Sequence, residues 1–174
     1  MSPTPAGAAG TDVAEPDVID RAAGLAPGMP LFAARRFRAT AIAGTQASHD
    51  ALLHEPVPGL GTADRLSVAV HCCEAAGAVE LAAHYRTLLA AARDATQPPS
   101  PALPAMRQWA ALLTTDPRRG DRAALVALKA AGLGDAAIVA LAQLVAFLSY
   151  QVRVVAGLKA MQQPRPAAFA GGPR

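Results

Sequence analysis

The sequence of 174 residues has few aromatic residues, few charges and only two cysteines. Aromatic residues make up 4% of the chain and charged residues 17%, whereas hydrophobic residues make up 52%. Aromatic residues favour β-strands, while alanine and leucine lead the helix-propensity scale, so this composition predicts an α-helical globular protein. It excludes disordered and collagen-like chains, which cannot bury enough apolar surface to form a core.

A basic stripe is also missing, although the 16 lysines and arginines outnumber the 13 acidic residues. The basic residues are scattered and do not alternate with aromatic ones, so the pattern predicts no nucleic-acid partner. The longest apolar stretch, residues 136–150, contains Gln143 and is followed by Gln151 and Arg153. A membrane span needs roughly 18 unbroken apolar residues, so we expect no membrane partner either.

The two cysteines, Cys72 and Cys73, are adjacent in the sequence. Neighbouring residues of a helix point about 100° apart, so this pair is poorly placed to form a disulfide. The first residues lack both the basic start and the apolar stretch that direct secretion or mitochondrial import. Both observations favour a reducing cytoplasm as the location of the chain.

Segments rich in proline and glycine divide the chain into parts. We expect residues 1–16 and 163–174 to be flexible, residues 17–162 to form one domain, and residues 94–104 to link two groups of helices. Apolar spacing predicts an all-α bundle of about seven helices, with Thr62 and Asp135 as N-caps and Gly132 just after a helix end. The helical stretches are residues 18–25, 31–39, 46–53, 63–76, 79–93, 105–114, 122–131 and 136–161.

Glu80 and His84 are the first candidate site residues. They lie four residues apart on a predicted helix and therefore share one face. A carboxylate beside an imidazole orients the ring and raises its basicity, which general acid–base catalysis requires. The same spacing is also common in solvated or packing pairs of helices, so the sequence leaves both interpretations open.

The run His71, Cys72, Cys73 and Glu74 is a second candidate, because thiols and an imidazole there are chemically able to take a redox or soft-metal role. Metal sites bring together three or four ligands, and these residues could reach further ligands only across a helix break. We therefore expect no metal and no other cofactor. Cysteines in an alanine-rich helix are usually small buried side chains.

Four further polar residues remain. His49 and His54 do not share a helix face and are predicted to be ordinary surface histidines. Arg153 lies either at the solvated end of its helix or, with Tyr150 and His71, along a polar pocket. The solvated position is favoured, because a buried arginine needs a carboxylate that this helix does not supply.

At this point two segments resemble a known family. The run ADRLSVAVHCCEAAGAVELAAHY, a helix, a glycine-containing break and a helix carrying a histidine, resembles the signature of the carboxymuconolactone decarboxylase and alkylhydroperoxidase-D-like family. The run TTDPRRGDRAALVALKAAGLGDAAIV, followed by a long apolar helix with Arg153, is similar to the peroxidase-related members. The resemblance covers roughly residues 17–162 and implies an all-α, alkylhydroperoxidase-D-like helical bundle that forms homo-oligomers.

The peroxidase branch of that family carries C-x-x-C-x-x-x-H, with a glutamate twelve residues before the first cysteine. A thiol at a helix N-terminus has a lowered pKa, attacks the peroxide as a thiolate and is resolved by its partner as a disulfide. Aligned on His84, the two cysteine positions fall on Gly77 and Glu80, and the glutamate position falls on Arg65. Peroxide reduction by the dithiol route is therefore not expected.

The decarboxylase branch lacks the dithiol and has a run of the type G-A-E-Y-E-W-A-H-H, to which AGAVELAAH aligns with Glu80 and His84 matched. This resemblance implies that His84 transfers a proton, with Glu80 orienting it, on a small carboxylated or lactone-like substrate. Two alternatives stay open. In the first, the chain is a noncatalytic, homo-oligomeric helical protein that binds a small ligand or assembles. In the second, it is a peroxidase that uses Cys72 or Cys73 as a displaced thiol.

Overall fold

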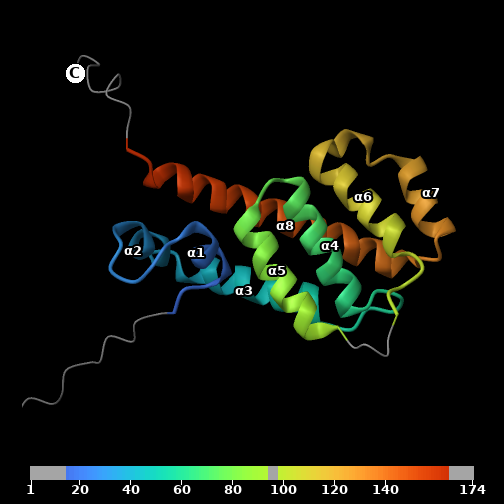
Figure 1. Ribbon diagram of the computed structural model, residues 1–174, viewed down its shortest axis with the longest axis horizontal. Helices are drawn as coiled ribbons and strands as arrows, with labels where there is room; N and C mark the ends of the chain where they lie inside the picture. The colour runs from blue at the N-terminus through green and yellow to red at the C-terminus, as the bar shows by residue number, and fades with distance from the viewer. Residues whose placement is uncertain (1–14, 94–97, 165–174) are drawn as a thin grey trace, which may run out of the picture.

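The computed structural model describes residues 15–93 and 98–164, and the described residues contain helices, turns and loops but no β-strand. Most of the two segments expected to be flexible, and residues 94–97 of the expected linker, lie outside the described residues. The predicted all-α class is confirmed. The helices are α1 (Val18–Ala23), α2 (Pro30–Arg36), α3 (Ala39–His54), α4 (Thr62–Ala75), α5 (Val79–Ala92), α6 (Leu103–Thr115), the short 3-10 helix η1 (Pro117–Arg119), α7 (Arg122–Ala130) and α8 (Asp135–Gln162) (Figure 1).

Glycines in the left-handed conformation end α1, α4 and α7, and those after α4 and α7 lie at breaks that the sequence predicts. Gly77, between α4 and α5, has a φ of 68°, and Gly132, after α7, has a φ of 96°. The N–H of Gly77 donates to the carbonyl of Glu74 at 3.0 Å, and that of Ala78 donates to the carbonyl of Cys73 at 2.8 Å. These two bonds satisfy the last carbonyls of α4, so the chain turns at once into α5. The predicted role of Gly132 is confirmed.

The N-cap predictions are wrong by one residue. Thr62 and Asp135 are the first helical residues of α4 and α8, and Gly61 and Gly134 occupy the N-cap positions. Asp135 still favours the start of α8, because its negative charge lies at the positive end of the helix dipole.

Helix α8 is the central element of the bundle. It packs against α1, α3, α4, α6 and α7, and in Figure 1 it runs along the molecule and passes behind the α4–α5 hairpin. By length and composition alone this 28-residue helix is also apolar enough to cross a membrane, a property that a count of unbroken apolar residues does not reveal. Its buried residues are Ala137, Ile138, Leu141, Leu144, Val145, Leu148, Gln151, Val155 and Leu158.

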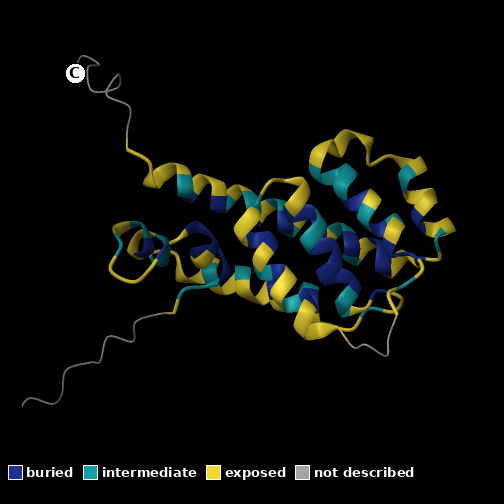
Figure 2. Cartoon of the chain, in the orientation of Figure 1, coloured by how far each residue is buried: buried dark blue, intermediate teal, exposed yellow. Residues whose placement is uncertain are grey.

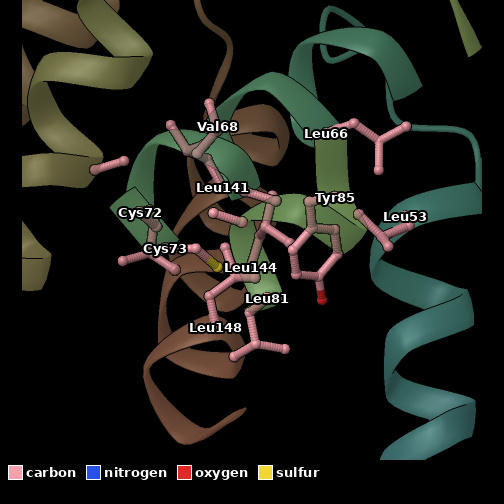
Figure 3. Packing of buried hydrophobic residues seen from close by; sticks show 14 of the residues in the cluster. Leu53, Leu66, Val68, Cys72, Cys73, Leu81, Tyr85, Leu141, Leu144 and Leu148 are labelled. Atoms are coloured by element: carbon pink, nitrogen blue, oxygen red, sulfur yellow. The ribbon is translucent and has the colours of Figure 1, made fainter. Parts of the chain in front are cut away.

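The α4–α5 hairpin supplies the other half of the core. Figure 3 shows side chains of α4 and α5 meeting the leucines of α8, with Leu53 approaching from α3. The burial pattern in Figure 2 agrees, because the buried residues concentrate along α4, α5 and the inner face of α8, whereas α7 is largely exposed. The core is therefore built mainly from aliphatic side chains, with the aromatic residues Phe32, Tyr85 and Trp109, of which Tyr85 is fully buried.

A buried carboxylate holds α1 to α2. Asp20 has no exposed surface and binds both Arg35 and Arg36, with 2.6 Å between its Oδ2 and the Nη2 of Arg36. Asp17 caps α1 and also pairs with Arg35 at 2.9 Å. At the same end of the bundle, the amide of Gln162 donates to the carbonyl of Ala23 at 2.8 Å, which ties the last turn of α8 to α1.

Candidate functional site

Glu80 and His84 both lie on α5, but the structure gives them different partners. Glu80 is exposed in the first turn of α5, and its Oε2 lies 2.6 Å from the Nζ of Lys159 on α8. The hydrogen bond from Lys159 lowers the pKa of Glu80 below its ordinary value. The contacts of the described residues include no bond between Glu80 and His84, so Glu80 does not orient the ring as expected. The ammonium group attracts a carboxylate more strongly than a neutral imidazole does.

His84 is half-buried, and its neighbours lie on α3, on α1 and on α5 itself. Its ring centroid lies 6.3 Å from that of His49 on α3 and 5.2 Å from that of Tyr85. Its Nε2 is buried and has no hydrogen-bond partner among the described residues. Burial, and then the nearby His49 and Arg21, lowers the pKa of His84, so the ring is neutral at pH 7 and able to accept a proton.

His49 is buried, with 7% of its surface exposed, so its predicted surface position is wrong, whereas His54 is exposed as predicted. The Nδ1 of His49 lies 3.1 Å from the Oδ1 of Asp50. A carboxylate only accepts hydrogen bonds, so Nδ1 of His49 is the donor in this contact. The Nε2 of His49 is also buried and has no partner within the described chain. The sequence feature that indicates the burial of His49 is Leu53, a buried leucine one turn later on the same helix face.

The Tyr85 ring lies next to both imidazoles, and its hydroxyl is bonded to Gln151. The hydroxyl of Tyr85 donates to the Oε1 of Gln151 at 2.5 Å, and both side chains are buried. Burial raises the pKa of Tyr85, which stays protonated as a donor. The rings of Tyr85 and His49 stack at 6.2 Å. We call His49, Asp50, His84, Tyr85 and Gln151 the imidazole cluster. The two Nε2 atoms of this cluster, which lack partners among the described residues, are placed to exchange protons with a bound molecule.

The adjacent thiols lie elsewhere, in the last turn of α4. Cys72 and Cys73 are both free and buried. Burial raises the pKa of Cys72 and raises that of Cys73 to about 12, so both are protonated and weakly nucleophilic at neutral pH. Cys72 borders a small hollow of about 60 Å³, and His84 is not among the residues that line it. The lining includes Cys72, Ala76, Thr114, Ser149, Val152 and Arg153.

The three predicted pocket residues do not meet in one place. Arg153 is exposed and borders the small hollow beside Cys72. Tyr150 borders a different hollow of about 280 Å³ between α2, α3 and α8, and its hydroxyl lies 3.2 Å from the Oγ1 of Thr45. His71 is half-buried and borders neither hollow.

The positions that carry thiol chemistry in the resembling family have other roles here. Gly77 forms the turn before α5, and Glu80 binds Lys159. Arg65 is buried, and its Nη1 donates to the carbonyl of Leu52 at 2.9 Å, near the end of α3. A cation at this end of a helix is favoured by the helix dipole. Among the described residues, no group of three or more His, Cys, Asp or Glu side chains is placed to hold a metal ion.

The fold is similar to that of a crystal structure of an uncharacterized peroxidase-related protein from Silicibacter sp. TM1040. The TM-score is 0.54 and the sequence identity 18%, over 88% of this chain and 84% of that chain. No protein-family model matches the sequence, and no curated protein matches it. The chain is thus an all-α helical bundle that shares its fold with a peroxidase-related protein, and its site has to be interpreted from its own residues.

Proposed function

We propose that this chain transfers protons to and from a small carboxylated or lactone-like substrate, with His84 and His49 as its acid–base groups. One observation carries the proposal. The buried His49 and the half-buried His84, from different helices, lie with their ring centroids 6.3 Å apart, and neither Nε2 has a partner among the described residues. Buried polar atoms are normally hydrogen-bonded, and exceptions concentrate at sites where a ligand or a reaction uses them.

The two imidazoles are suited to different parts of a proton transfer. The lowered pKa of His84 keeps this ring neutral and ready to accept a proton from a carbon acid. The carboxylate of Asp50 lies 3.1 Å from Nδ1 of His49 and so holds the orientation of this ring. We assign the return of the proton to His49, which lies opposite His84 in the cluster, and Asp50 takes the orienting role that the sequence assigned to Glu80.

The charge next to the cluster supports an anionic substrate. Arg21 on α1 is exposed, and its positive charge is near enough to contribute to the lowered pKa of His84. Its Nη1 donates to the carbonyl of Pro16 at 2.5 Å, which leaves further guanidinium donors for a carboxylate. Thiol chemistry is not part of the proposal, because no cysteine occupies position 77 or 80 and both existing thiols are buried.

Deuterium exchange tests this proposal directly. Small lactone carboxylates and 2-oxo acids are incubated with the protein in D2O, and loss of the C–H signal is followed by proton NMR. We expect His84→Gln and His49→Gln to lower the exchange rate at least a hundredfold. The matched control is His54→Gln, which removes an exposed histidine from the same helix as His49. Exchange that is absent from the native chain, or equal in all four proteins, contradicts the proposal.

A noncatalytic, homo-oligomeric assembly protein is the second candidate, and a separate observation favours it. Large apolar side chains are exposed on several helices, and Phe37 at 90% and Met161 at 70% are the most exposed. Such side chains are often covered in an assembly. The buried Nε2 atoms of the imidazoles are also out of contact with solvent. Absence of exchange together with a stable oligomer would favour this candidate.

A further inference from the structure

The facing surfaces of α6 and α7 leave a hollow of about 160 Å³ between them. On both helices the lining residues are three or four positions apart in the sequence, so each wall of the hollow is a single face of its helix. Alanine occupies three of the positions, and a methyl group is too short to fill the space between two packed helices. The lining residues that matter here are Ala105, Gln108 and Trp109 of α6 and Ala124, Ala127 and Leu128 of α7.

The chemistry of the lining selects a neutral ligand. No charged side chain borders the hollow, so a charged occupant would leave its charge unpaired. Two polar groups belong to the wall residues. Gln108 carries an amide, and Trp109, which is 6% exposed, carries an indole N–H with no hydrogen-bond partner in the described part of the chain. A buried donor without a partner is costly, and an occupant with an acceptor offers one.

The size of the hollow selects a single ring. An apolar cavity of about 150 Å³ in another protein binds benzene. Access is available along α7, because Leu128 is its only buried residue and Figure 2 shows most of this helix exposed. A helix held by so few buried contacts shifts at small cost in free energy.

We infer that the hollow between α6 and α7 is a binding site for a neutral, single-ring molecule that carries one hydrogen-bond acceptor. This site is separate from the imidazole cluster and does not depend on the proposed function. Its occupant packs against the indole of Trp109 and fills the space that the three alanines leave open.

The chain contains one tryptophan, so a single indole N–H signal reports on the site. Cyclohexanone is titrated into the ¹⁵N-labelled full chain, and this signal is followed by two-dimensional NMR. We expect a saturable shift with a dissociation constant on the order of 1 mM, as befits a ligand of so few atoms. The matched charged probe, cyclohexanecarboxylate, is expected to cause no shift at the same concentrations.

Variants locate the site. Ala124→Leu adds bulk to the wall of the hollow and is expected to weaken cyclohexanone binding at least tenfold. If Ala124→Leu does not fold, Ala127→Leu replaces it, with the same expected loss of affinity. Ala123→Leu adds the same bulk at an exposed position of α7 that does not border the hollow, so its affinity is expected to match the native chain. The inference is overturned if the native chain shows no saturable shift, or if the filled variant binds equally well. A shift that follows protein concentration instead of probe concentration overturns it too, in favour of a second copy of the chain.

Discussion

At the scale of single residues, one hydrogen bond between fully buried side chains joins α5 to α8. The hydroxyl of Tyr85 and the amide oxygen of Gln151 are 2.5 Å apart. Tyr85→Phe removes the hydroxyl that donates to the buried Oε1 of Gln151 and leaves this oxygen without a hydrogen bond. We therefore expect a loss of about 1–3 kcal/mol in the free energy of unfolding, measured with urea. The double variant Tyr85→Phe with Gln151→Met removes both polar partners. It should be closer to the native stability than the single variant, and the reverse order would contradict this account.

The two thiols provide a second prediction at this scale. Burial raises the pKa of both cysteines, so little thiolate is present at pH 8. We expect iodoacetamide to modify Cys72 and Cys73 at least a hundredfold more slowly in the native chain than in urea, as followed by mass spectrometry. The native chain should also consume no organic hydroperoxide in the presence of a dithiol reductant. Rapid consumption that is lost in Cys72→Ser would show that a displaced thiol is active after all.

At the scale of elements, two glycines should respond in opposite ways to the same substitution. Gly77 holds the left-handed turn between α4 and α5, whereas Gly157 lies inside α8, and an added methyl group meets no atom at either position. Gly77→Ala should therefore destabilise the protein by about 1 kcal/mol through backbone strain alone. Gly157→Ala should stabilise it by about 0.5–1 kcal/mol. Thermal unfolding followed by circular dichroism measures both, and equal signs would contradict the assigned backbone conformations.

The junction of α1 and α2 depends on pH through Asp20. Burial alone would raise the pKa of Asp20, but the hydrogen bonds from Arg36 and Arg35 lower it below the ordinary value. A lowered pKa in the folded state means that the stabilisation is complete above the unfolded value of about 3.9 and is lost as the pH falls through the folded value. We expect Asp20→Asn to cost about 3 kcal/mol at pH 6 and less near pH 2, because protonation of the carboxyl removes this contribution as the pH falls through the folded value. Urea unfolding at both pH values measures the difference, and a cost that does not change with pH would contradict it.

The sequence predicts those features that depend on nearby residues. The breaks at Gly77 and Gly132 could be predicted because the preference of glycine for positive φ is a local property. The partner of Glu80 and the burial of His49 could not be predicted. Lys159 reaches Glu80 from α8, and Tyr85 covers His49 from α5, and both helices are distant in the chain from the residue they contact. Helical spacing shows which residues share a face, but not which other helix covers that face.

At the scale of the whole molecule, we propose a homo-oligomer, as the sequence resemblance implies. Light scattering should give a mass that is a multiple of 17.7 kDa. Phe37→Ser and Met161→Ser remove the two large apolar side chains that are most exposed among the described residues. Phe37 follows α2 and Met161 lies in the last turn of α8, which borders α2, and both changes should shift the mass toward the monomer. Val126→Ser, on α7 at the other end of the bundle, is the control for a general effect of polarity. A monomer at all concentrations up to about 100 μM would contradict the proposal.

The position of α8 in the chain has a consequence for biosynthesis. This helix is made last among the described elements, yet α1, α3, α4 and α6 all pack against it. A ribosome that stops before Asp135 would release a polypeptide whose earlier helices expose their apolar faces together. Such a fragment would not be a smaller folded protein, and we expect molecular chaperones and proteases to remove it.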